Sequence, residues 1–178
     1  MIYKAGLKKF FPLIFACFFL FHCGYHLRGT GSFLPSHIKK INIPMFKNLT
    51  TRFELDLKLT QGVIDELVAR GKVEITADMQ AADAVLLGEI ISFRVTPIAF
   101  AKDASADRYN VTVVTNIMLR DLVNQKIIFS NPNFTYQHEY EVLDKQEGTD
   151  FESVESEALD KIAEKFARSL VSTILEGF

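Results

Sequence analysis

The chain has 178 residues, of which 20 are basic and 22 are acidic, and it carries a formal net charge of −2. This near balance of charge gives no indication of a nucleic-acid partner, for which a basic patch would be expected. Its hydrophobic content of 48%, with 16 Phe and no Trp, is sufficient for one domain with a packed core.

The N-terminal stretch has the pattern of a signal peptide. Lys4, Lys8 and Lys9 form a basic start, and residues 10–21 follow as twelve residues without a charge. A membrane-spanning helix needs about 17 to 25 apolar residues, so this run is too short to span a bilayer but matches the apolar region of a signal peptide. A buried N-terminal core helix is the alternative, and it would leave the basic start unexplained. We expect residues 1–22 to be a signal peptide.

A cysteine stands directly after this apolar run. The sequence Leu-Phe-His-Cys at residues 20–23 resembles the end of a bacterial lipoprotein signal, in which the cysteine is acylated and becomes the first mature residue. Leu20 matches the leucine of that motif, while Phe21 and His22 stand where the motif has small residues. Cys17 is the alternative, but cleavage there would shorten the apolar run to about seven residues and leave a Phe-rich mature end. We therefore expect lipidation of Cys23.

The mature chain is expected to be a tethered domain. Removal of residues 1–22 leaves 156 residues with a net charge of −5 and without a cysteine pair for an internal disulfide bond. Residues 23–36 contain glycines, serines and a proline that indicate a lipidated tether. Residues 37–178 are expected to form a single α/β domain.

The first half of this domain predicts a strand, a helix and a long strand. Residues 38–46 alternate as a strand that stops near Pro44. Thr51 and Glu54 match a capping box at the start of a helix that Gly71 ends. The expected apolar stripe of that helix is Phe53, Leu57, Val63, Ile64, Leu67 and Val68. After a connector at 78–83, residues 84–96 predict a strand with one shared face of Val85, Leu87, Ile91, Phe93 and Val95.

The second half predicts a hairpin of strands and a long helix. Residues 97–107 read as a loop, and residues 108–120 show the clearest alternation in the chain. A turn at 121–125 leads to a strand at 126–142, in which Pro132 predicts a bulge or an edge position. The last helix is expected to begin at a second capping box, Thr149 and Glu152. Its apolar stripe runs for seven turns through Phe151, Val154, Ala158, Ile162, Phe166, Leu170 and Ile174.

These elements together predict an α/β sandwich of the α+β class with the order β-α-β-β-β-α. Two amphipathic helices are expected to pack on one face of a four-stranded mixed sheet. The strands on either side of the first helix should be parallel, and the later strands should be connected as hairpins. The other face of the sheet should remain polar and available for contact, with Asn110, Thr112, Asn116 and Arg120.

The start of the mature chain carries a resemblance to a known family. Cys23 is followed by Gly-Tyr-His-Leu-Arg-Gly, and with the order of elements this resembles the LPS-assembly lipoprotein family LptE over essentially the whole mature chain. The resemblance implies a lipid-anchored outer-membrane protein that faces the periplasm. It also implies that the protein sits inside the β-barrel LptD, supports the assembly of that barrel and helps to deliver lipopolysaccharide to the outer leaflet.

Motifs of catalysis are absent from the sequence, so an enzyme is not expected. It contains no G-x-S-x-G, H-E-x-x-H, Walker A or paired-cysteine motif, and we expect no cofactor and no metal. His26 lies close to Cys23, but acylation would consume the thiolate that a metal site needs. His138 lies on an aromatic strand face, where a hydrogen-bonded core histidine is expected rather than a ligand.

Lipopolysaccharide presents phosphates and carboxylates beside acyl chains, so a protein that binds it needs cations next to apolar surface. The best candidates in the sequence are Arg94, Lys102 and Arg108, which lie near Ile98 and Phe100. The alternative is that these are ordinary solvated charges, because Asp103 and Asp107 dilute the positive field.

Two kinds of function are compatible with these observations. The first is the one that the resemblance implies, with an LptD-like barrel, lipopolysaccharide and the membrane as partners. The second is a periplasm-facing lipoprotein of similar build that assists another envelope or secretion complex. Capture of one large barrel protein would distinguish the first from the second.

Overall fold

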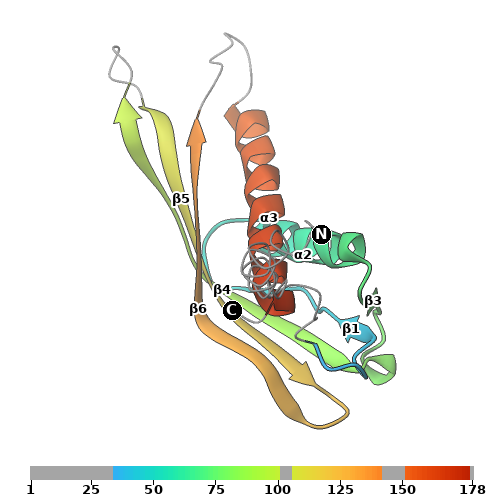
Figure 1. The fold of residues 1–178 in the computed structure, drawn as a ribbon. Coiled ribbons are helices and arrows are strands. Elements are labelled where there is room, and N and C mark those ends of the chain that lie inside the picture. Colours follow the sequence, from blue (N-terminus) through green and yellow to red (C-terminus); the bar gives the residue numbers. More distant parts are fainter. Residues whose placement is uncertain (1–33, 101–105, 142–150, 177–178) are drawn as a thin grey trace, which may run out of the picture. The chain divides into compact units, whose positions relative to one another are not determined.

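The computed structural model describes residues 34–100, 106–141 and 151–176. Within these ranges the chain forms six strands, two α-helices and one short 3₁₀ helix (Figure 1). In chain order they are β1 (Lys40–Asn42), β2 (Lys47–Asn48), α2 (Leu55–Arg70), β3 (Glu74–Ile75), η1 (Met79–Ala81), β4 (Ala84–Phe100), β5 (Ala106–Asp121), β6 (Lys126–Glu141) and α3 (Phe151–Glu176). Among these residues no helix is both long and apolar enough to cross a membrane. The expectations for the signal peptide, Cys23, Lys102 and Thr149 lie outside the described residues.

The sheet is mixed, as the sequence predicts, but it has six strands rather than four. Its order is β3-β1-β4-β5-β6, with β2 paired to β4 beside β1. Strand β1 is parallel to β4 across helix α2, and β4, β5 and β6 are successive antiparallel neighbours. The two additional strands are short. The expected strand at 38–46 is β1, which stops before Pro44 as predicted. Strand β2 follows at Lys47–Asn48 and pairs separately with β4, and the apolar alternation around Ile75 forms β3 beside β1.

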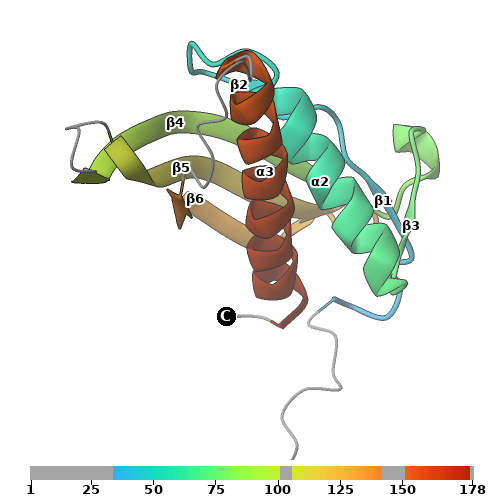
Figure 2. The same ribbon diagram turned by 90° about the horizontal axis from the view of Figure 1, so that it is seen from above.

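Both helices cover the same face of the sheet (Figures 1 and 2), which confirms the predicted fold class. On β5 the alternation sorts the side chains as expected, and the buried ones are Val111, Val113, Thr115, Ile117 and Leu119. Helix α3 extends for 26 residues and buries its apolar face on the sheet and on α2. Phe166 is at the centre of this layer, with its ring edge-on to the rings of Phe134 and Tyr136 from β6.

The bulge predicted at Pro132 is present. Thr115 pairs with Phe134 and Ile117 pairs with Asn131, so Asn116 alone stands opposite Pro132 and Asn133. Strand β6 is also the last strand of the sheet. A proline that cannot donate to a ladder is compatible with both positions.

Helix α2 starts later than the capping box predicts. It begins at Leu55, and the preceding residue, Glu54, has a left-handed backbone (φ 60°) and makes no side-chain cap hydrogen bond. A local turn competes with the helix at this point. Asn48 donates from its Nδ2 to the carbonyl of Arg52 over 2.7 Å, and the Arg52 N–H donates to the Thr50 hydroxyl over 3.2 Å. Because side chains satisfy this backbone, it remains a loop.

The apolar stripe of α2 also differs from the expected one. Its buried apolar residues recur every four positions and are Leu55, Leu59, Val63 and Leu67. Phe53, Leu57 and Val68 are exposed instead. Both stripes have helical spacing, so the periodicity alone does not distinguish them. The contact with α3 decides which stripe is buried, because the helices approach so closely at Gly62 that a Cβ there would lie only 3.0 Å from the carbonyl oxygen of Ala163. The end of the helix is as predicted, with Gly71 left-handed (φ 62°).

The expected shared face of β4 holds for Val85, Leu87 and Ile91 but is wrong for Phe93 and Val95, and it is not the face that the helices cover. The strand turns Ala84, Leu86 and Ile90 into the helix-side core. Leu87 and Ile91 point to the other side and are 41% and 42% exposed. A bulge at Ile91, where the register shifts between Ile90 and Ser92, then changes the alternation. From Phe93 to Pro97 the odd-numbered positions pair with the inward residues of β5, so Phe93 returns to the core side.

Candidate functional site

Two of the three residues expected to bind lipopolysaccharide lie on one face of the sheet. Arg94 on β4 pairs with Thr112 of β5, and Arg108 on β5 pairs with Ala99 of β4. The alternation of both strands places these two arginines on the face away from the helices. Arg108 stands four residues before Thr112, so the two positions are about 13 Å apart along the strands. Both side chains are exposed, and the third residue, Lys102, lies outside the described residues.

The segment around these arginines is a strand hairpin rather than the expected loop at 97–107. Strand β4 continues through Pro97 to Phe100, and β5 begins again at Ala106. Strands β1 and β2 pair only with the first half of β4, so the second half has β5 as its paired neighbour. A proline is tolerated there because no ladder is needed on its other side, and the register shift between Pro97 and Ala99 accommodates it. Ile98 and Phe100 are exposed on this hairpin, so apolar surface does lie beside the arginines.

The face of the sheet away from the helices is less polar than expected. Asn116 lies on it as predicted and donates to Oε2 of Glu89 over 3.2 Å. Glu89 also pairs with Lys47 of β2, with 3.5 Å between Nζ and Oε1. Leu87 and Ile91 stand on either side of Glu89 on the same strand. This part of the sheet therefore carries a self-paired polar row between apolar side chains.

A buried carboxylate joins the start of the domain to the β5–β6 turn. Asp121 is only 3% exposed, and its Oδ1 accepts the backbone N–H groups of Val123 and Asn124 over 2.8 and 2.9 Å. Its Oδ2 lies 2.8 Å from Nε2 of His37. Burial opposes ionisation, but the hydrogen bonds from Asn124, His37 and Val123 outweigh it and lower the pKa of Asp121 to about 2. With every oxygen engaged, this group serves as a structural link between the two segments.

His138 is hydrogen bonded, as the sequence suggests, but it is half-buried at the margin of the core. Its Nε2 accepts from Nζ of Lys165 on α3 over 2.9 Å, and its ring stacks on Tyr136. Burial lowers the pKa of His138, and the neighbouring Lys165 ammonium lowers it further. Over the part of the chain that the structure describes, no group of three His, Cys, Asp or Glu side chains could hold a metal ion.

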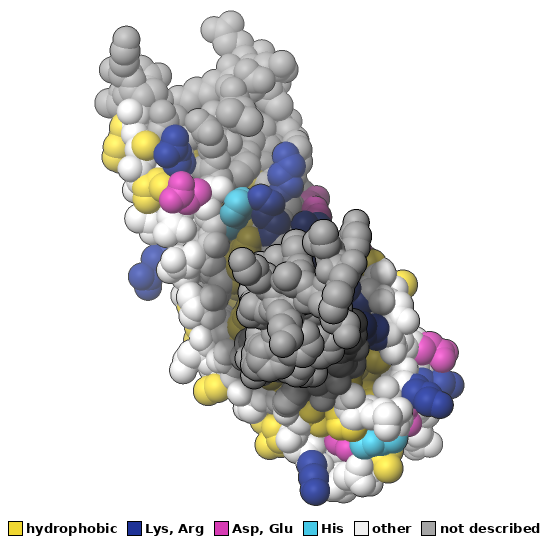
Figure 3. Space-filling model, in the orientation of Figure 1, with side chains coloured by type: hydrophobic (Ala, Val, Ile, Leu, Met, Phe, Trp, Pro, Cys, Tyr) yellow, Lys and Arg dark blue, Asp and Glu magenta, His cyan; other side chains and the backbone are white. Residues whose placement is uncertain are grey.

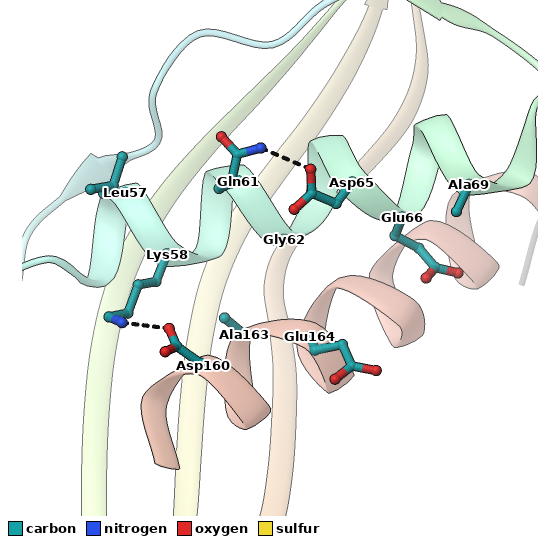
Figure 4. Close-up of a pocket in the computed structure, with 10 residues that line it drawn as sticks. All are labelled: Leu57, Lys58, Gln61, Gly62, Asp65, Glu66, Ala69, Asp160, Ala163 and Glu164. Atoms are coloured by element: carbon teal, nitrogen blue, oxygen red, sulfur yellow. Dashed lines mark hydrogen bonds and ion pairs between the residues drawn. The ribbon is translucent and has the colours of Figure 1, made fainter. Parts of the chain in front are cut away.

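A shallow groove of about 560 Å³ runs between α2 and α3 on the side away from the sheet (Figure 4). Gly62 and Ala163 bring the two helices together along it. Its rim is charged, but the charges are already matched by neighbours. Lys58 pairs with Asp160, Gln61 donates to Asp65, Arg70 pairs with Glu66, and Arg168 pairs with Glu164. Because these charges already have partners, the groove offers little to attract a charged ligand.

The fold and these surfaces define a class, the two-layer α+β domain with one helix-covered sheet face. Solved structures of the same fold include the hypothetical protein CT253 from Chlamydia trachomatis, with a TM-score of 0.53 and 10% identity over 79% of this chain and 97% of that one. A PelC dodecamer from Paraburkholderia phytofirmans has a TM-score of 0.52 and 17% identity over 82% and 96% of the two chains. At such identities the likeness shows the fold alone.

The family model for LptE, described as lipopolysaccharide-assembly, matches residues 38–174. The chain belongs to the LptE family. No curated protein matches it significantly. Membership confirms the resemblance seen in the sequence, and it makes the chain a non-enzymatic envelope lipoprotein of lipopolysaccharide assembly.

Sequence reasoning missed the apolar character of the open sheet face. The signal that could have revealed it is the run Ala-Val-Leu-Leu-Gly-Glu-Ile-Ile at residues 84–91, which does not alternate. Strands that are apolar on both sides are typical of burial on both faces.

Proposed function

We propose that this chain is an outer-membrane lipoprotein that faces the periplasm and binds and braces an LptD-like β-barrel. In this role it assists the assembly of lipopolysaccharide at the outer leaflet. The observation that carries the proposal is the LptE family match, which spans all six strands and almost all of both described helices. The decisive experiment is capture of the mature lipidated protein from solubilised envelopes. One large barrel protein should be recovered in stoichiometric amount.

Depletion provides the second arm of this test. If the chain braces the barrel, depletion should lower the amount of correctly assembled barrel and increase outer-membrane permeability. Normal barrel levels and permeability after depletion would contradict the bracing role. Recovery of a secretion or cell-wall complex in place of a barrel would instead support the more general lipoprotein function.

The anchor in this proposal is Cys23, which becomes the acylated first residue of the mature chain. Each buried methylene contributes about 0.8 kcal/mol, and one acyl chain alone binds a membrane only marginally, so two or three chains on Cys23 make attachment persistent. Mass spectrometry of the mature N-terminus should find a triacylated Cys23. An unmodified Cys23, or acylation of Cys17, would contradict this assignment.

Lipopolysaccharide contact is assigned to Arg94, Lys102 and Arg108. The shared face of Arg94 and Arg108 and the exposed side chains of Ile98 and Phe100 support this assignment, because they provide cations beside apolar surface. Substitution of Lys102→Glu with Arg108→Glu should weaken lipopolysaccharide binding in vitro, with a larger effect at low salt. The fold and barrel capture should be unchanged.

A matched control for this experiment is Arg120→Glu with Lys126→Glu, two exposed basic residues where β5 and β6 join. The control should bind lipopolysaccharide like the wild type. Equal binding by both double variants and the wild type would mean that Lys102 and Arg108 do not contact lipopolysaccharide and are ordinary surface charges. In that case Lys145 is the next basic residue to test, and it lies outside the described residues.

A further inference from the structure

The first half of β4 is apolar on both of its faces. On the helix side Ala84, Leu86 and Ile90 are fully buried, while on the other side Leu87 and Ile91 are 41% and 42% exposed. An antiparallel strand with one solvated face normally alternates between apolar and polar residues, as β5 does. Val85, on the same side as Leu87 and Ile91, is only 4% exposed, so the chain already covers the start of the strand there and leaves Leu87 and Ile91 partly open. The composition of β4 is therefore that of a strand with a layer on each side.

The segment around β2 adds two more apolar side chains to the same face. Phe46 points into the core, where its ring lies against Gly88, so its neighbours Met45 and Lys47 point the opposite way, as does Leu49. The ion pair of Lys47 with Glu89 confirms this direction. Met45 and Leu49 are 60% and 54% exposed. Lys47 pairs with Glu89 in the ladder. Met45 and Leu49 therefore lie on either side of Lys47, just as Leu87 and Ile91 lie on either side of Glu89.

The polar side chains in the middle of this surface are paired with one another through Glu89. Lys47 on β2 and Asn116 on β5 both contact Glu89 on β4 between them, so the carboxylate has both a cation and an amide donor. A surface with this row can be covered without leaving a buried charge unpaired, which would be costly. For the same reason it is poorly suited to an anionic lipid headgroup, since its cation is already paired.

We propose that this surface, defined by Met45, Lys47, Leu49, Leu87, Glu89, Ile91 and Asn116, is where the domain packs against the inner wall of its β-barrel partner. The inference rests on the proposed function and deepens it by naming the surface. A barrel wall is itself a twisted sheet, and two sheets pack face to face at about 10 Å through apolar side chains. The polar row lies across that contact and fixes its position along the strands.

The size of the surface distinguishes this partner from a second copy of the chain. A stable two-body interface needs about 20–30 residues on each side, and this surface has seven. Alone it would not hold two copies together. A barrel that surrounds the domain contacts it elsewhere at the same time, so a small patch suffices as one contact among several.

The test uses the full-length lipidated chain with Leu87→Thr and Ile91→Thr together. Threonine retains strand propensity while removing apolar surface. The matched control is Val95→Thr, which is in the same strand and 48% exposed but pairs with the inward residue Val111 and so points to the opposite face. We expect the double variant to capture about tenfold less barrel in detergent than the wild type, and the control to capture the same amount.

Photo-crosslinking residues at 87, 91 and 95 of the otherwise unchanged chain provide a readout that does not depend on the stability of the double variant. Crosslinks from 87 and 91 to the barrel that are stronger than any crosslink from 95 support the proposal. Equal capture by wild type and double variant with no crosslink from 87 or 91 overturns it and leaves the proposed function standing. Crosslinks from 87 or 91 to a second copy of the chain also overturn it. If the wild type captures no barrel at all, the proposed function fails, and the inference fails with it.

Discussion

The ring of Phe46, next to β2, lies against Gly88 of β4, and substitution of Gly88 by alanine tests the packing of the core directly. A Cβ at this position would lie 2.7 to 2.8 Å from three ring atoms of Phe46. Carbon atoms in contact normally stay about 3.5–4.0 Å apart. Phe46 is fully buried and its backbone N–H donates to the Thr60 hydroxyl of α2 over 2.9 Å, so the ring has little freedom to withdraw.

Overpacking of this kind costs about 1–3 kcal/mol of the free energy of unfolding. For a domain of this size each kcal/mol lowers Tm by about 2–4 °C, so Gly88→Ala should lower it by about 2–12 °C. Thermal and urea unfolding of the mature chain without lipid would measure this. Combining it with Phe46→Leu should relieve the clash, with a coupling of about 0.5–3 kcal/mol between the two substitutions.

Gly71→Ala is the control, because a Cβ there has open space and the cost is only that of the left-handed backbone, about 1–2 kcal/mol. It should show no coupling with Phe46→Leu. A Gly88→Ala variant as stable as the wild type, or effects of Gly88→Ala and Phe46→Leu that simply add, would refute this account of the packing.

Two further predictions follow from the corrected helix stripe and from the buried carboxylate. Leu59→Ala in the core should lower the free energy of unfolding by about 2–5 kcal/mol. Leu57→Gln on the exposed side of α2 should change it by no more than about 0.5 kcal/mol. Urea unfolding measures both, and a larger loss for Leu57→Gln than for Leu59→Ala would support the stripe expected from the sequence instead. The pKa of Asp121 is about 2 in the fold, below the usual value of 3.8, so its ionised form contributes stability above pH 4 that is lost as pH falls through about 2. Asp121→Asn should therefore have a lower free energy of unfolding than the wild type at pH 7, and this difference should become smaller as the pH is lowered. A difference in free energy of unfolding that does not depend on pH would contradict the role of the charge.

Sequence reasoning succeeded where one pattern had one physical explanation. Strand β5 alternates without exception from Val111 to Leu119, and one of its faces is buried. The seven-turn stripe of α3 is equally unambiguous, because Ile162, Phe166 and Leu170 recur on one side and all are buried. Pro132 excludes a regular central strand, and it lies in a bulge of the last strand of the sheet.

It failed where two patterns competed. Helix α2 has two apolar stripes, and the choice between them depends on the approach of Gly62 to α3, which is a tertiary contact that spacing does not encode. In β4 a bulge at Ile91 changes the face of the residues that follow as far as Pro97, and a one-residue slip of this kind leaves no mark on local propensity.

The candidate site could be predicted only in part for a similar reason. The sequence places Arg94 and Arg108 on two strands of one hairpin, and the structure places both on one face. The sequence places Leu87 and Ile91 on one face of a strand, but it does not indicate which face the helices cover. Both helices cover the opposite face, so Leu87 and Ile91 are exposed.

The two sides of the domain are built for different surroundings. On the helix side, the Lys58–Asp160, Arg70–Glu66 and Arg168–Glu164 pairs cover an exposed surface. Such pairs contribute only about 0–1 kcal/mol each to the free energy of unfolding. Their main effect is to make this side of the domain hydrophilic. Charged side chains are scattered over the surface in Figure 3 among apolar ones. The open sheet face instead presents four large apolar side chains around one neutralised row.

This asymmetry bears on the proposed function, in which the lipoprotein folds before it meets its barrel partner. Soluble monomers tolerate apolar patches of up to a few hundred Å², about the area that a few half-exposed side chains provide. Glu89 is already paired with Lys47 and Asn116 in the free domain. Covering the open face therefore does not leave this carboxylate buried without a partner. An apolar surface of this size is compatible with a domain that stays in solution in the free state. A larger partner can bury it without a change in the fold.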